Sequence, residues 1–199
     1  MARLTWTLVF TLVPLALAGC KDSTKPTEPS AIVPSTARTS GGDAAAGRGL
    51  STRFVSMMDA CDPATFNAVL GPGSCTRQGG VSFDKFVAQL ERHQEAGAWH
   101  FAPPTLQAKA SGDQVIIATN RGGEEHTFTR VANFGGGIVP MLNDLSGNPT
   151  VAPECTQLDD DDFVEPGGTY TAPIDASGTL LFQCCIHPWM RTVVHATHK

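Results

Sequence analysis

The sequence has few charged residues, few basic residues and no apolar run of the length that a transmembrane helix needs. Only 17% of its 199 residues are charged, and 14 Lys and Arg against 19 Asp and Glu give a net charge of -5. Because phosphate binding needs a basic surface, this balance excludes nucleic acid and anionic membranes as partners. The apolar run at residues 4–17 is short and contains Pro14, which argues against a transmembrane helix.

The sequence also lacks the short motifs of common enzyme classes. It contains no GxSxG, HExxH, P-loop or Rossmann glycine fingerprint. We therefore predict that the protein is not an enzyme. It has instead 20 Gly and 14 Pro beside 41% hydrophobic residues, a mixture that favours strands and turns over long helices.

The first 19 residues have the pattern of an export signal, with Arg3 at the positive start and residues 4–17 as the apolar stretch. The ending Leu17-Ala18-Gly19-Cys20 resembles a bacterial lipobox. This resemblance implies cleavage before Cys20 and lipid on its sulfur and amino terminus. The expected product is a periplasmic or cell-surface protein that only the lipid holds at the membrane. Residues 20–50 are rich in Ser, Thr, Pro, Ala and Gly, and we predict a flexible tether.

Residues 51–98 are predicted to be a helical segment. Asp62 can cap a helix with Pro63 at its first position, and Ser82 can cap a second helix. An apolar stripe at helical spacing follows and must pack on other residues. Its members are Phe83, Phe86, Val87 and Leu90. Fewer than fifty residues make a poor independent core, so we expect a cap docked on the following domain, with a separate partner-binding module as the alternative.

From about residue 99 the pattern changes to short alternating strands between turns. Such strands over about one hundred residues favour a mainly β fold, a Greek-key β-sandwich at residues 99–199 preceded by the helical segment. A long Pro- and Gly-rich connection is expected at residues 145–168. The expected strands include residues 106–109, 115–118, 126–129, 180–184 and 192–197.

The most informative stretch runs from Cys184 to Met190 and holds a thiolate, an imidazole and a thioether at the offsets Cys-x2-His-x2-Met. These donors suit copper, and two His with one Cys and a distant Met form the blue-copper geometry. One His is missing from the motif and must come from elsewhere. Alternation along the strand puts Phe182 and Cys184 on one face and Cys185 on the other, so Cys184 is the inward sulfur.

Residues 99–199 resemble the cupredoxin family, in particular small blue-copper proteins of the plastocyanin and azurin type. The resemblance implies one mononuclear copper, Cu(I) or Cu(II), bound by His126, Cys184, His187 and Met190. It also implies that the Thr127 backbone amide bonds the Cys184 sulfur and that Asn120 helps to hold the His126 loop. The supporting motifs are Cys184-x2-His187-Pro188-Trp189-Met190, Phe101-x-Pro103, Gly112-Asp113, His126-Thr127-Phe128 and Pro166-Gly167.

The route for electrons is expected to be an exposed edge of His187. Trp189, with Pro188 beside it, is predicted to form an apolar collar around that edge, where transient redox proteins dock. A core position for the Trp189 ring is the alternative. The donor and acceptor are expected to be other proteins, and the chain itself a monomer.

The six cysteines raise the question of oxidation. Cys61 and Cys75 flank the first predicted helix and indicate a disulfide in an exported protein. A disulfide between Cys184 and Cys185 would destroy the copper site. With the lipidated cysteine, the first pair and the ligand set aside, Cys155 and Cys185 remain as a candidate pair that would clamp the long connection to the ligand strand.

The sequence thus predicts a lipid-anchored blue-copper protein that transfers single electrons. A copper protein for trafficking or resistance is the alternative, and an adhesion or structural lipoprotein with a vestigial site is a third hypothesis. The acidic run at residues 159–162 is expected to be a solvated loop rather than a calcium site. Four further histidines are expected to be surface or structural residues: His93, His100, His195 and His198.

Overall fold

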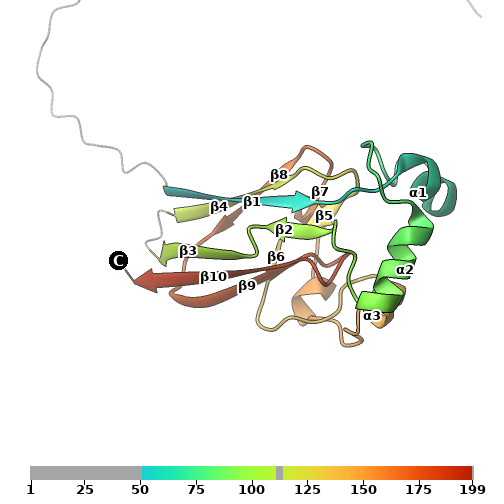
Figure 1. Ribbon diagram of the computed structural model, residues 1–199. Coiled ribbons are helices and arrows are strands. Elements are labelled where there is room, and N and C mark those ends of the chain that lie inside the picture. The colour runs from blue at the N-terminus through green and yellow to red at the C-terminus, as the bar shows by residue number, and fades with distance from the viewer. Residues whose placement is uncertain (1–50, 111–113, 199) are drawn as a thin grey trace, which may run out of the picture. The chain divides into compact units, whose positions relative to one another are not determined.

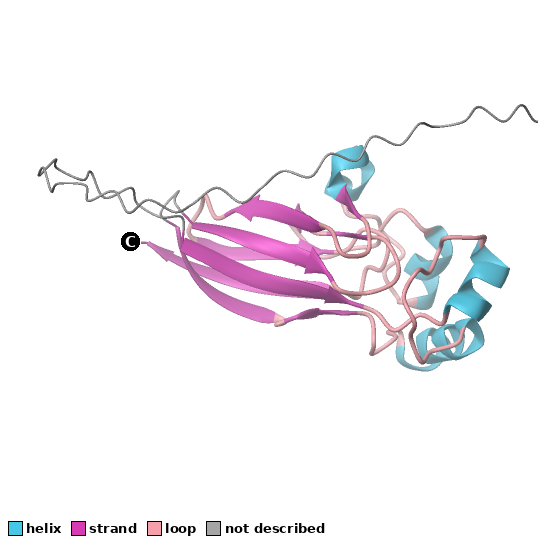
Figure 2. Cartoon of the chain, turned by 90° about the horizontal axis from the view of Figure 1, so that it is seen from above, coloured by secondary structure: helices cyan, strands magenta, loops and turns pink. Residues whose placement is uncertain are grey.

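Two four-stranded sheets lie face to face in the computed structural model, which describes residues 51–110 and 114–198 (Figures 1 and 2). The expected signal peptide at residues 1–19, the tether at 20–50 with Cys20, and the Gly112-Asp113 pair lie outside the described residues. The predicted mainly β sandwich is confirmed. The first sheet has the order β2 (His100–Ala102), β1 (Ser51–Met58), β4 (Gln114–Asn120) and β8 (Thr169–Pro173). The second has the order β3 (Thr105–Ala110), β10 (Arg191–His198), β9 (Gly178–Gln183) and β6 (Thr129–Val131).

The helices α1, α2 and α3 lie toward one end of the sandwich (Figure 1). A short ladder pairs β5 (His126–Thr127) with β7 (Phe163–Val164). Three α-helices and two short 3-10 helices fill the connections. They are α1 (Pro63–Leu70), α2 (Phe83–His93), α3 (Pro140–Leu145), η1 (Pro153–Thr156) and η2 (Asp160–Asp162).

The first strand corrects the prediction that residues 51–98 are helical throughout. Residues 51–58 form β1, which pairs in parallel with β4 and antiparallel with β2. Val55 and Met57 alternate along this strand and are fully buried, which explains why it joins the sheet. The sandwich therefore includes a strand from before residue 99, and the helical part of the segment follows β1.

The two helices after β1 begin where the caps predict. The Asp62 carboxylate accepts a hydrogen bond of 3.1 Å from the Thr65 amide at the start of α1, and Gly71 ends this helix with φ +109°. Ser82 precedes α2 without a side-chain capping bond. Phe86 and Leu90 of the apolar stripe are buried in the same core as the sandwich. The helices therefore pack on the sandwich as a cap.

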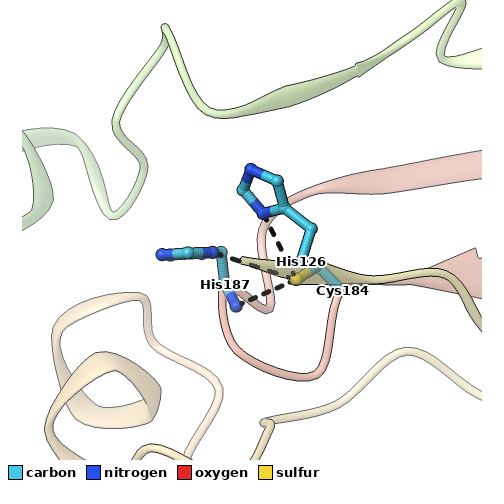
Figure 3. Close-up of side chains that lie close together, drawn as sticks. All are labelled: His126, Cys184 and His187. Carbon is cyan, nitrogen blue, oxygen red and sulfur yellow. Dashed lines mark hydrogen bonds between the residues drawn. The ribbon is translucent and has the colours of Figure 1, made fainter. Parts of the chain in front are cut away.

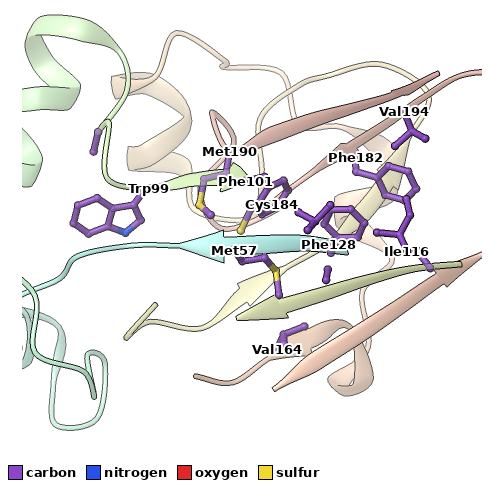
Figure 4. Close-up of a cluster of buried hydrophobic side chains, with 14 of the residues drawn as sticks. Met57, Trp99, Phe101, Ile116, Phe128, Val164, Phe182, Cys184, Met190 and Val194 are labelled. Carbon is purple, nitrogen blue, oxygen red and sulfur yellow. The ribbon is translucent and has the colours of Figure 1, made fainter. Parts of the chain in front are cut away.

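Aromatic rings fill the space between the sheets (Figure 4). The rings of Phe128 and Phe182 stack with centroids 4.6 Å apart, and Phe101 lies 5.2 Å from Phe128. Cys184 continues this inward row. Just past the end of β9, Cys185 points to the opposite side and belongs to a separate small cluster of buried residues. The predicted strand parity is therefore confirmed.

Two disulfides are present among the described residues, Cys61–Cys75 and Cys155–Cys185. Cys184 is the one free cysteine among them, and it is buried. Cys155 lies in η1, so its bond ties the long connection before β7 to the loop after β9, at the residue next to Cys184.

The acidic run and the four further histidines, which are not predicted metal ligands, lie at the surface. The acidic run forms η2, whose three residues are not buried, and the Asp159 side chain accepts from the Asp161 amide. The four further histidines are exposed. Within the part of the chain that the structure describes, no helix combines the length and the apolar character needed to span a membrane.

Candidate metal centre

Three buried side chains place their metal-binding atoms around one point (Figure 3). Nδ1 of His126 and Nδ1 of His187 each lie 3.8 Å from Sγ of Cys184. All three ligand atoms lie within 4.8 Å of one another. His126 and Cys184 are fully buried, and His187 is 3% exposed. The three residues that the motifs predicted as equatorial ligands are thus brought together.

These distances fit a metal ion between the three atoms. Metal–sulfur and metal–nitrogen bonds of about 2.3 and 2.0 Å, meeting at about 120°, would place S and N about 3.7 Å apart. The observed 3.8 Å is close to that value. One thiolate and two imidazoles in a trigonal arrangement are the donor set that favours copper among common metals.

Met190 is the predicted fourth ligand, and the loop after β9 closes around it. Its amide donates to the His187 carbonyl at 2.9 Å, and its carbonyl accepts from the Cys184 amide at 3.0 Å. The side chain is fully buried, and in the view of Figure 4 it extends toward the Cys184 sulfur. A short loop held by its own backbone bonds thus carries three of the four predicted ligands.

The surroundings of Cys184 stabilise its thiolate form. The Thr127 amide donates to Sγ at 3.4 Å, the contact that the resemblance implied, and the His187 amide donates at 3.5 Å. Burial raises the pKa of the thiol, but the bonds with His126 and His187 outweigh burial and hold this pKa well below its usual value. Because the thiolate is the metal ligand, the site is prepared for a cation.

Asn120 holds the loop that carries His126. This buried amide donates to the carbonyls of Glu124 and Val164, both at 2.7 Å, and its oxygen accepts from the Gly122 amide at 2.9 Å. The role suggested by the resemblance thus has a direct structural basis.

Asp59, just after β1, is a site residue that the sequence did not reveal. Its Oδ2 lies 3.0 Å from Nε2 of His126, the ring nitrogen that faces away from Cys184. Burial raises the pKa of Asp59, but bonds from His126 and the amides of Gly123 and Glu124 outweigh it and lower this pKa to about 2. Burial also lowers the pKa of His126, yet Asp59 and Cys184 raise it to about 9 in the metal-free protein. An ionised carboxylate behind a ligand His fixes the ring orientation and raises its basicity.

A second acidic group, Glu124, faces the other imidazole. Its Oε2 lies 3.7 Å from Nε2 of His187 and accepts a hydrogen bond of 2.5 Å from the Trp99 indole. Burial raises the pKa of the Glu124 carboxyl. Asp59 and Glu124 also lie close to Cys61, but the disulfide of Cys61 excludes that group as a metal site.

The predicted exposed edge of His187 is absent. The Phe86 ring from α2 lies 6.4 Å from the His187 ring and 6.0 Å from the Trp189 ring. Pro188 is buried and Trp189 is only partly exposed, so these residues form no open collar around the imidazole. The expectation was wrong because the apolar stripe of α2 packs over this end of the sandwich.

Comparisons with known proteins give structural likenesses only. No protein-family model matches the sequence, and no curated protein matches it. The purple cupredoxin of Nitrosopumilus maritimus aligns with 73% of this chain and 99% of its own, at 12% identity and a TM-score of 0.40. The plastocyanin of Dryopteris crassirhizoma aligns with 50% of this chain and 89% of its own, at 17% identity and a TM-score of 0.33. A multicopper oxidase aligns with 75% of this chain and 39% of its own, at 15% identity and a TM-score of 0.35.

Proposed function

We propose that this protein is a type 1 copper protein that transfers single electrons between exported or membrane-bound redox partners and catalyses no reaction of its own. The observation that supports this most directly is the buried trio of one thiolate and two imidazoles, with both S–N distances at 3.8 Å. Copper held by His126, Cys184, His187 and Met190 supplies a Cu(I)/Cu(II) couple. The residues around these ligands then determine how the copper would be held and how electrons would reach it.

The chain keeps the ligands in one geometry in both redox states. The amides of Thr127 and His187 point at the sulfur, Asp59 holds the His126 ring, and Asn120 holds the loop before it. Because these groups are buried and already bonded to one another, little rearrangement accompanies the gain or loss of an electron. A small rearrangement is what rapid electron transfer requires.

The covered position of His187 changes the proposed route for electrons. Instead of leaving through an open imidazole edge, they cross the aromatic layer that covers it. The Phe86 ring lies 4.6 Å from that of Trp99, and the Trp189 ring lies 5.5 Å from that of His187. Redox proteins therefore dock on the outer surface of this layer.

Anchoring is a separate part of the proposal and rests on the lipobox resemblance. We propose that Cys20 is lipidated and that the tether at residues 20–50 connects the monomeric sandwich to the membrane. Incorporation of labelled palmitate into the wild-type protein, and its loss in Cys20→Ala, is the expected result. Equal labelling of both proteins would contradict the anchor without affecting the copper site.

Copper reconstitution tests the main proposal. Adding Cu(II) to the purified metal-free protein should produce an intense copper–thiolate absorption band in the visible region, with one copper bound per chain. Cys184→Ser and His187→Gln should abolish the band. His195→Gln is the matched control, because His195 is exposed on β10 and should leave the band unchanged.

Two outcomes would count against the proposal. If the wild-type protein develops no band, the site is not a blue-copper site. If the band forms but copper leaves the protein on reduction, the copper-trafficking alternative is favoured over electron transfer. Reversible oxidation with full retention of copper is the expected result.

A further inference from the structure

An apolar pocket lies beside the metal centre and shares Phe86 and His187 with the aromatic layer described above. Its volume is about 160 Å³, and α1, α2, α3 and the loop after β9 contribute to its walls. Leu70 and Met141 line it and are 51% and 54% exposed, so the pocket opens to solvent between α1 and α3. Its inner wall is formed by His187 and Glu124.

The walls favour a flat aromatic ligand. Three phenylalanine rings line the pocket together with the imidazole, and they come from α1 and α2. Aromatic side chains bind another aromatic ring in offset-stacked or edge-to-face contact. The volume is close to that of a cavity of about 150 Å³ that binds benzene in another protein. The lining rings are Phe66, Phe83 and Phe86.

Besides the His187 imidazole, the Glu124 carboxylate is the charged group in this lining. The Glu124 side chain is 9% exposed, and its Oε2 is already bonded to the Trp99 indole. Its Oε1 accepts no hydrogen bond from any residue that the structure describes, and it keeps some contact with solvent. A carboxylate oxygen without a partner in such a pocket is costly to desolvate, and a ligand that brings a donor would satisfy it.

We propose that this pocket binds a small phenol, that is, a benzene-sized ring with one hydroxyl group that donates to Oε1 of Glu124. The ring contacts the three phenylalanines and lies against the outer side of His187. The site is formed by protein groups alone and requires no metal. Its existence therefore does not depend on the proposed copper function.

Titration of the metal-free protein with phenol tests this site, with toluene as the matched ligand that lacks the hydroxyl group. Binding is followed by NMR through the methyl groups of Leu70, Met141 and Ile186, which line the pocket. Phenol should bind saturably and about tenfold more tightly than toluene, the value of one net hydrogen bond. The shifts should be confined to these pocket residues.

A pair of identical substitutions locates the site. Val139, the residue before α3, lines the pocket, whereas Val69 on α1 does not. Val139→Phe fills the pocket and should abolish binding of both ligands, whereas Val69→Phe, at a position 59% exposed, should leave binding unchanged. Thermal unfolding of both variants shows that the fold is retained.

Three results would overturn the proposal. Absence of saturable phenol binding means that the pocket holds water or nothing. Equal affinities for phenol and toluene mean that Glu124 does not receive a donor. Binding that persists in Val139→Phe means that phenol binds elsewhere. None of these results would affect the copper–thiolate band of the reconstituted protein, so failure here is distinguishable from failure of the proposed function.

Discussion

Asp59 and His126 are joined by a hydrogen bond of 3.0 Å between a carboxylate oxygen and Nε2, while Nδ1 of the same ring faces Cys184. The two residues are 67 positions apart in the sequence. The side chain of Asp59 is 1% exposed and that of His126 is fully buried. The carboxylate therefore acts on the metal centre only through the orientation and basicity of the imidazole.

Replacing Asp59 should weaken the metal centre without removing a ligand. Loss of a carboxylate behind a ligand His typically lowers metal affinity about 10- to 100-fold. We expect Asp59→Asn to lower Cu(II) affinity by this amount and to raise the reduction potential, because a negative charge near the more highly charged ion is lost. Competition with a chelator and a redox titration measure the two effects. Asp175→Asn, at an exposed carboxylate bonded to Arg130, should change neither.

The same carboxylate gives the metal-free protein a defined pH dependence. The pKa of Asp59 falls from 3.8 to about 2 in the folded protein. A lowered pKa contributes stability that is present above pH 3.8 and is lost as the pH falls through about 2. The loss amounts to about 2 kcal/mol in the free energy of unfolding.

Urea denaturation between pH 2 and 5 checks this pH dependence. The difference in unfolding free energy between wild type and Asp59→Asn should shrink as the pH falls. Asp84→Asn, at an exposed residue of α2, should follow the wild type. A difference that stays constant over this range would contradict the assignment.

The Cys155–Cys185 disulfide should protect the thiolate next to it. In Cys155→Ser, Cys185 becomes a free thiol adjacent to Cys184, and we expect the copper–thiolate band to fade under mild oxidation as these two sulfurs react. The double variant Cys155→Ser/Cys185→Ser should keep the band, since no second thiol remains. Both variants should lose about 3 to 4 kcal/mol of unfolding free energy, from the 30-residue separation of the bonded cysteines. A stable band in the single variant would show that the disulfide has no protective role.

The helical cap should control access to His187. Phe86 is 3% exposed and its ring contacts the rings of Trp99, Trp189 and His187. Phe86→Ala should destabilise the protein by about 3 to 5 kcal/mol and speed reduction of the copper by ascorbate, because the imidazole becomes accessible to solvent. Phe54→Ala is the matched control, since Phe54 is 65% exposed on β1. Unchanged reduction kinetics in Phe86→Ala would show that the cap does not restrict access.

The ligand motif was readable from the sequence because its information is local. Cys184 and Cys185 follow β9 directly and continue its alternation, which assigns one to each face, and Phe182 and Cys184 are buried in the same cluster. The caps at Asp62 and Gly71 are local signals of the same kind. Loop closure between Cys184 and Met190 needs only seven residues.

The contact of Asp59 with His126 and the packing of α2 over His187 could not be predicted from the sequence. Both depend on contacts between segments that are far apart in the chain. Asp59 reaches His126 because β1 runs parallel to β4, with Met57 opposite Asn120, so the residue after β1 lies beside the loop after β4. The alternation of Val55 and Met57 was the available signal for β1, but nothing in it specifies the partner strand. In the same way, the stripe on α2 predicted burial against some surface and could not identify His187 as part of it.

The parallel pairing of β1 with β4 also separates Ser51 from the metal centre. Ser51, where the described chain begins, lies with the C-terminal end of β10 at the end of the sandwich opposite the helices and the metal centre (Figure 1). The eight residues of β1 span about 25 Å between these ends. The start of the described chain and the capped face of His187 therefore lie at opposite ends of the sandwich, so a protein that docks on the cap would approach from the side away from Ser51.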